Sequence, residues 1–162
     1  MEKNISQIPI WNKIIKQLNT SKIDYILVGA AALVIHGLPR STLDLDIYVP
    51  AKKEVLENLF KIAYSLGLKS DQKSILTLSN SPKLFTDQWI CFSYKGQDIL
   101  DIFFSKAKDF DELFKNSEIK KDNTLSIRIA SLHDIFMMKK SCARAIDIAD
   151  IALIKEVKKH LK

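Results

Sequence analysis

Apolar residues recur at three- and four-residue spacing in several stretches of the chain, which is the pattern of helices with one buried face. Gly67 follows one such stretch and provides a stop, and Ser131 with Asp134 has the spacing of a helix-opening cap. This pattern predicts helices over residues 8–18, 30–36, 52–66, 107–114, 131–143 and 144–160.

Short apolar or alternating runs between these stretches predict strands. They cover residues 25–28, 43–49, 75–78, 89–94, 98–104 and 125–129. Residues 95–97 have the composition of a hairpin connection. Over residues 43–49, apolar side chains alternate with Asp44, Asp46 and Tyr48, so this strand should have one buried face and one polar face.

Together these elements predict an α+β fold, with a small mixed sheet and helices packed on one side. No repeat, linker or low-complexity segment interrupts the chain, so residues 1–162 are expected to form a single domain. The last part, about 131–161, is expected to be a helical segment. Phe103 and Phe104 are expected in the core.

The composition is that of an ordinary globular protein, with 47% hydrophobic and 27% charged residues. Cys91 and Cys142 lie far apart without metal-ligand spacing, which favours reduced thiols. The longest apolar run is too short to span a bilayer, and the first ten residues lack an export signal. A cytoplasmic protein without a membrane partner is therefore expected.

The net charge of +6 suits an anionic partner such as a nucleotide or a nucleic acid. The lysines are spread along the chain, and no pattern of stacking aromatic residues accompanies them. Charge alone therefore does not identify a nucleic-acid site.

Two acids on one face of a strand are unusual, because Asp is depleted in strands and like charges repel. Asp44 and Asp46 lie about 6.6 Å apart along that face, close enough to bind the same Mg²⁺ or a pair of ions. Two-metal phosphoryl chemistry needs a further ligand. Asp101 is the leading candidate, because it is the lone acid inside an apolar run, and Asp98 is the competing one.

Gly29 lies between a predicted strand and a short helix, where its backbone can approach a ligand and free N–H groups face a phosphate. Arg40 is a candidate phosphate clamp or else a surface ion-pair residue. His36, in the last turn of the short helix, is interpreted as structural.

The string Gly29-Ala30, His36-Gly37, Arg40, Thr42 and Asp44-Leu45-Asp46 resembles the nucleotidyltransferase superfamily of DNA polymerase beta type. It is most similar to small bacterial stand-alone members, including the AbiE-type toxin nucleotidyltransferases. Ala30 departs from the Gly-Gly or Gly-Ser that the family usually has. Alanine keeps the close backbone approach but offers no hydroxyl to a phosphate.

The resemblance implies a nucleotidyltransferase-like palm with Asp44, Asp46 and Asp101 as catalytic metal ligands. It also implies Mg²⁺, with two ions expected, and an NTP such as ATP as substrate. Gly29, Ala30, Arg40, Thr42 and Lys139 are the implied nucleotide-binding residues. The last helix opens with an Arg144–Asp147 pair, and Asp150 follows. We interpret this pair as an ordinary structural one.

The implied reaction moves a nucleoside monophosphate from an NTP to an acceptor hydroxyl and releases pyrophosphate. The acceptor stays open between a tRNA end, a protein and a small molecule. One alternative is a catalytically weak binding module, such as a toxin–antitoxin component with a partner protein. Another is an antibiotic-modifying nucleotidyltransferase, against which the positive net charge argues.

Overall fold

The computed structural model describes residues 9–122 and 125–161. The helices are α1 (Pro9–Thr20), α2 (Gly29–Ile35), α3 (Lys53–Ser65), the 3₁₀ helix η2 (Lys73–Leu78), α4 (Pro82–Phe85), α5 (Ala107–Asn116), α6 (Leu132–Cys142) and α7 (Ala145–His160). The strands are β1 (Ile26–Val28), β2 (Leu45–Pro50), β3 (Trp89–Tyr94), β4 (Gln97–Ser105), β5 (Glu118–Asp122) and β6 (Leu125–Ile129).

The six strands form one mixed sheet in the order β3-β4-β2-β1-β6-β5. β2 pairs with β4 in parallel and with β1 in antiparallel, while β1 pairs with β6 in parallel. β3–β4 and β5–β6 are antiparallel hairpins at the two edges. This arrangement confirms the predicted α+β fold with a small mixed sheet, and it makes β2 and β4 neighbours.

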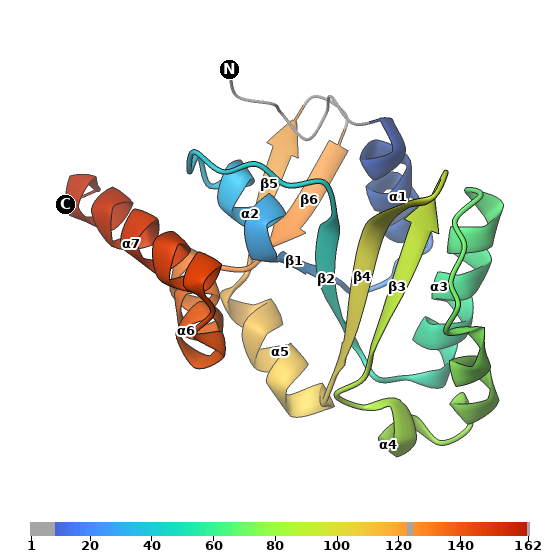
Figure 1. Cartoon of the computed structure of the whole chain (residues 1–162). Coiled ribbons are helices and arrows are strands. Elements are labelled where there is room, and N and C mark those ends of the chain that lie inside the picture. Colours follow the sequence, from blue (N-terminus) through green and yellow to red (C-terminus); the bar gives the residue numbers. More distant parts are fainter. Residues whose placement is uncertain (1–8, 123–124, 162) are drawn as a thin grey trace.

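The two faces of β2 differ in composition, as its alternating sequence predicts. Leu45, Ile47 and Val49 are fully buried on one face, whereas Asp46 and Tyr48 are only partly buried on the other. On the buried face, Phe60 of α3 contacts Phe92 of β3 with ring centroids 5.1 Å apart. Helices α1 and α3 lie on this side of the sheet, and α2, α5, α6 and α7 lie on the side of the acidic residues (Figure 1). Helices therefore lie on both faces of the sheet and not on one side as the sequence predicts.

Most predicted elements are confirmed, with boundaries shifted by one or two residues. The hairpin between β3 and β4 turns on Lys95 and Gly96, both with positive φ, as a tight two-residue turn requires. Ser131 caps α6 by accepting a hydrogen bond from the backbone N–H of Asp134 at 3.1 Å. Ile8, the first residue of the first predicted helix, lies outside the described residues.

The predicted strand at 75–78 is wrong, because this segment forms η2. The position that a strand would take beside β3 is occupied by the side chain of Gln72. Its amide accepts a hydrogen bond from the Cys91 backbone at 2.7 Å and donates one to the Trp89 carbonyl at 2.9 Å. The backbone of Lys69 pairs with Ser93 further along the same edge, so residues 69 and 72, not 75–78, bond to the outer edge of β3.

Two elements are absent from the sequence prediction. β5 is a strand in which four of the five residues are exposed, so its sequence lacks the apolar alternation that predicts a strand. α4 begins at Pro82, in a stretch for which the sequence analysis predicts no helix or strand, and it places Phe85 in the core. Within the described residues, no helix is long and apolar enough to cross a membrane.

Candidate active site

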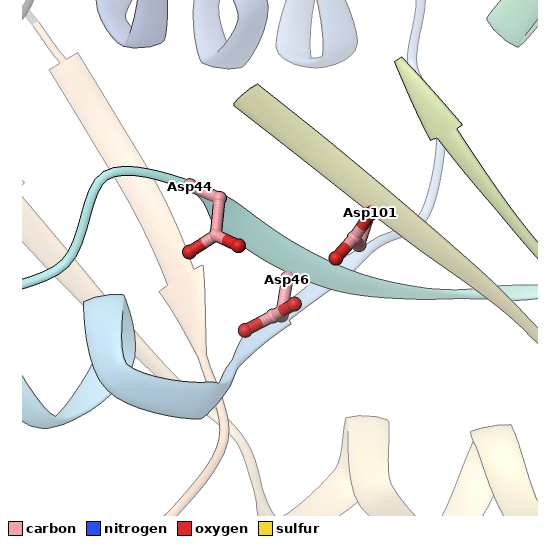
Figure 2. Close-up of side chains that lie close together, drawn as sticks. All are labelled: Asp44, Asp46 and Asp101. Carbon is pink, nitrogen blue, oxygen red and sulfur yellow. The ribbon is translucent and has the colours of Figure 1, made fainter. Parts of the chain in front are cut away.

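Three carboxylates meet where β2 begins and where β4 runs beside it. Asp44 directly precedes β2, Asp46 lies within it, and Asp101 is the partner of Asp46 in the parallel β2–β4 register. One ligand oxygen from each residue lies within 4.8 Å of those of the other two. Figure 2 shows the three side chains gathered in this way. Residues far apart in sequence therefore form one acidic cluster.

Gly29 makes room for this cluster. It has a φ of +66°, which L side chains rarely adopt, and a Cβ at this position would collide with Oδ2 of Asp46. β1 holds it there, because Val28 is the partner of Asp46 in the β1–β2 ladder. The glycine is therefore required both by the backbone conformation and by the Asp46 carboxylate.

Asp44 is oriented by a neighbour in the loop that leads into β2. The Thr42 hydroxyl lies 2.9 Å from Oδ1 of Asp44 and 3.2 Å from its carbonyl oxygen. Thr42 thus positions a carboxylate through its side chain.

The electrostatics of the cluster reflect burial and mutual repulsion. Burial raises the pKa of Asp46 to about 7, and the negative charges of Asp44 and Asp101 add to this effect. Burial also raises the pKa of Asp101, against a hydrogen bond from Cys91 that lowers it. In the absence of a cation, the site therefore disfavours three ionised carboxylates.

These residues fit a hard divalent cation such as Mg²⁺. All three donors are carboxylate oxygens, which Mg²⁺ prefers. In addition, Oδ1 of Asp101 is buried and has no hydrogen-bond partner within the described part of the chain. A cation would satisfy this oxygen and remove the repulsion between the acids.

A basic wall stands beside the carboxylates and consists of Arg40, Lys139 and Arg144. Two buried acids of α7 hold it, each 1% exposed. Asp150 lies 2.7 Å from Nε of Arg40 and 2.8 Å from Nζ of Lys139. Asp147 lies 2.8 Å from Nε of Arg144 and 3.3 Å from Nζ of Lys139.

The three cations of this basic wall are therefore shared between two acids, which leaves one positive charge in excess. Lys139 and Arg144 already act on Asp46, whose pKa their charges lower against the larger opposing effects. The sequence interpretation treats Arg144–Asp147 as an ordinary pair. The sequence signal for the larger network is two acids three positions apart in the otherwise apolar first ten residues of α7.

A cavity of about 490 Å³ opens between the acidic cluster and the basic wall. Seven of the eight site residues predicted from sequence line it, and the eighth, Asp101, is the strand partner of Asp46. Those seven are Gly29, Ala30, Arg40, Thr42, Asp44, Asp46 and Lys139. Asp98 also lines the cavity but is exposed and is not part of the acidic cluster.

His36 lies outside this cavity and has a structural contact, as expected. Its Nε2 is 2.8 Å from the carbonyl oxygen of Ala130, which ties the end of α2 to the segment after β6. This contact supports the helix that Gly29 begins.

Comparison with known proteins gives one family and several solved structures of similar fold. The model of a family described as nucleotidyltransferases of unknown function (DUF6036) matches residues 10–160. Among curated proteins, no sequence matches the chain significantly.

Two solved structures are similar in fold. A candidate nucleotidyltransferase from Thermotoga maritima is 12% identical with a TM-score of 0.57, and the match covers 96% of this chain and 92% of that one. A polyadenylate synthase of Megavirus is 17% identical with a TM-score of 0.52. That match covers 86% of this chain but 27% of the viral protein.

Proposed function

Because the chain belongs to the family of nucleotidyltransferases of unknown function (DUF6036), we propose that it transfers a nucleoside monophosphate from an NTP to an acceptor hydroxyl, with pyrophosphate as leaving group. The observation that carries this proposal is the acidic cluster of Asp44, Asp46 and Asp101 across two neighbouring strands. Such a cluster costs folding energy and is expected where a cation is bound.

Each carboxylate has a separate task in this proposal. Asp44 and Asp46 would hold the Mg²⁺ of the incoming triphosphate, and Asp101 would share a second ion on the side of the acceptor. Bound Mg²⁺ supplies charge neutralisation on the phosphates and lowers the pKa of the acceptor hydroxyl. As a carboxylate beside the metal ligands Asp44 and Asp46, Asp101 is also the group proposed to receive the hydroxyl proton.

The remaining residues bind and orient. Gly29 and Ala30 offer backbone at the start of α2 to the phosphates, and Thr42 holds the Asp44 carboxylate. Arg40, Lys139 and Arg144 place positive charge along the wall of the cavity, where the triphosphate would lie. Positioning of the two reactants in line contributes much of the rate in such reactions.

Two finer assignments rest on the sequence. The likeness to AbiE-type toxin nucleotidyltransferases depends on the residues from His36 to Asp46 and stays a prediction. A binding module without turnover is the second candidate. It is favoured by Ala30 and by the ion pairs that Asp147 and Asp150 form with the cations of the basic wall. Label transfer from an α-labelled NTP to an acceptor in cell extract would separate the two.

The direct test is calorimetry with each NTP in the presence and absence of Mg²⁺. We expect Mg²⁺ to strengthen binding, and Asp44→Asn or Asp46→Asn to weaken it at least about tenfold, since each removes a ligand charge. Asp98→Asn is the matched control, because it changes a carboxylate in the same cavity that lies outside the cluster. Binding of Mg·NTP by both cluster variants at wild-type strength would refute the metal site.

A further inference from the structure

The face of the sheet that carries the acidic cluster also carries a row of aromatic side chains. In the β2–β4 register Tyr48 is the partner of Phe103, and in the β3–β4 register Trp89 is the partner of Phe103. We call these three residues the aromatic row. The neighbouring row across the same strands is Asp46, Asp101 and Cys91. Strand geometry separates the two rows by about 6.6 Å.

Phe103 contacts both of the other rings, and Trp89 at the sheet edge is the most exposed of the three. Tyr48 and Phe103 meet edge to face with centroids 5.3 Å apart, and Trp89 stacks on Phe103 at 6.4 Å with an interplanar angle of 30°. Tyr48 and Phe103 are half-buried, whereas Trp89 is 50% exposed. By contrast, Phe104 on the other face is 1% exposed, so only one of the two phenylalanines expected in the core lies there.

Exposed cations follow the aromatic row directly. β4 ends at Ser105, and the chain enters α5 through Lys106 and Lys108, both exposed. Lys106 lies 3.7 Å from Asp87 in a pair that is open to solvent on both sides. Carboxylates, aromatic rings and cations therefore succeed one another along β4 and into α5.

We propose that the aromatic row binds the base of the acceptor, and that the acceptor is the 3′ end of a single-stranded nucleic acid. The proposal rests on the proposed transferase function. Aromatic side chains on the face of a sheet stack bases in single-strand-binding modules. One ribose separates a base from its 3′-hydroxyl, so a base on Phe103 and Trp89 would bring that hydroxyl to Asp101. The preceding phosphate would point toward Lys106 and Lys108.

The reaction follows from this placement. The 3′-oxygen forms a bond to the α-phosphorus of the NTP while the bond from that phosphorus to the bridging oxygen breaks. Pyrophosphate leaves with the electron pair, and the hydroxyl proton passes to Asp101. Sequence reasoning missed the aromatic row because its members come from three strands and only the register aligns them.

The test measures binding of a dye-labelled adenylate hexanucleotide by fluorescence anisotropy, with an abasic oligonucleotide of equal length and charge as the comparison. We expect the base-bearing strand to bind more tightly, and Phe103→Leu or Trp89→Leu to weaken its binding roughly fivefold to a hundredfold. Tyr64→Leu is the matched control, because Tyr64 is an exposed aromatic residue on α3, across the sheet from the aromatic row. It should bind like the wild type.

Trp89 also gives a direct signal, since the only other tryptophan, Trp11, is 2% exposed and shielded from a ligand. Stacking should quench the wild-type emission. Phe103→Tyr and Trp89→Tyr keep a stacking ring and should bind within about twofold of the wild type, which covers the case in which a leucine variant fails to fold. Equal binding of the abasic strand, or weakening by the tyrosine variants as large as by the leucine variants, would overturn the proposal.

Calorimetry of the wild type with Mg·ATP separates this proposal from the proposed function. Binding of Mg·ATP without base-dependent binding of the oligonucleotide would refute the base-binding role of the aromatic row and leave the proposed transferase function standing. Base-dependent oligonucleotide binding without any Mg·ATP binding would refute the transferase function and leave a nucleic-acid site.

Discussion

At the scale of single residues, the site consists of groups that are costly in the fold and useful toward a cation. Asp46 illustrates this, because burial and two neighbouring acids raise its pKa to about 7. Gly29 is the complementary case, since the Asp46 carboxylate occupies the space that a side chain at position 29 would need. Each residue has a consequence that can be measured without knowing the acceptor.

Asp46→Asn should stabilise the metal-free protein at pH 8. The folded pKa of about 7 lies above the ordinary value of 3.8, so the folded state holds its proton more tightly than the unfolded state. Stability from this group is thus fully present below about pH 4 and is lost as the pH rises through about 7. Urea unfolding in EDTA at pH 4, 6 and 8 should show the advantage of the variant growing with pH.

Asp111→Asn, a change at an exposed position on α5, serves as the control for general charge effects. It should leave the pH dependence as it is in the wild type. Destabilisation of Asp46→Asn by a kcal/mol or more at pH 8, on the scale of a lost charged hydrogen bond, would indicate that the acid serves the fold through a partner.

Gly29→Ala should be more damaging than Gly37→Ala, although both residues have positive φ. The left-handed backbone costs an alanine about 1–2 kcal/mol at either position. Only at position 29 does the new Cβ meet Asp46, whereas nothing lies within 4 Å of it at position 37. Urea melts with and without Mg²⁺ should show a larger loss for Gly29→Ala and no stabilisation by the metal. Equal losses and equal responses to Mg²⁺ would contradict this.

At the scale of elements, α7 is tied to the loop before β2 by ion pairs. Asp150 takes part through both of its oxygens, one toward Arg40 and one toward Lys139. Because the acid is 1% exposed and Lys139 about 10%, these contacts are hardly screened by solvent. They hold the basic wall in place relative to the acidic cluster.

Asp150→Asn should therefore cost about 3 kcal/mol of unfolding free energy, because it leaves two cations short of a buried partner. The matched control is Glu156→Gln on the same helix, whose pairs with Lys159 and His160 are exposed. Its cost should be below about 0.5 kcal/mol. Urea denaturation of both variants decides the matter, and similar small costs would mean that the buried ion pairs are not needed for stability.

Most elements were predictable from the sequence because their apolar spacing is regular. The failures have physical causes in tertiary structure. β5 is a strand only because β6 lies beside it, as its own residues are largely exposed. The apolar run at 75–78 looks like a strand, but the edge of β3 is already bonded to the side chain of Gln72 and to the backbone of Lys69.

The candidate site was predictable to a similar degree. Asp44 and Asp46 stand out on one strand, and Asp101 stands out as the lone acid in an apolar run. What no local pattern contains is the register that pairs Asp46 with Asp101 and Phe103 with both Tyr48 and Trp89. Nor could the sequence show that Arg40 pairs with Asp150, because the two residues are 110 positions apart in the chain.

At the scale of the whole molecule, the residues of the site fall into two groups with different proposed tasks. The basic wall and the pair Asp44 and Asp46 line the cavity that is proposed for the triphosphate. Asp101 and the aromatic row lie on the side proposed for the acceptor. This division predicts which changes affect binding and which affect turnover.

Asp101→Ala should abolish label transfer from an α-labelled NTP while keeping much of the NTP affinity. An interaction made mainly in the transition state shows itself as a loss confined to the chemical step. The measurement is label transfer beside calorimetry for wild type and variant. Equal transfer by both proteins would remove Asp101 from the mechanism and make Asp98 the third ligand. No transfer by the wild type with any acceptor would favour the binding module.

The parallel pairing of β2 with β4 also bears on how the chain folds. The two strands meet only after the segment containing α3, η2, α4 and β3 has been spanned, so their pairing carries a large loop-closure cost. That same step brings Asp46 and Asp101 together. If the pairing of β2 with β4 belongs to the folding nucleus, Mg²⁺ should increase the refolding rate. If the pairing forms later, Mg²⁺ should only decrease the unfolding rate.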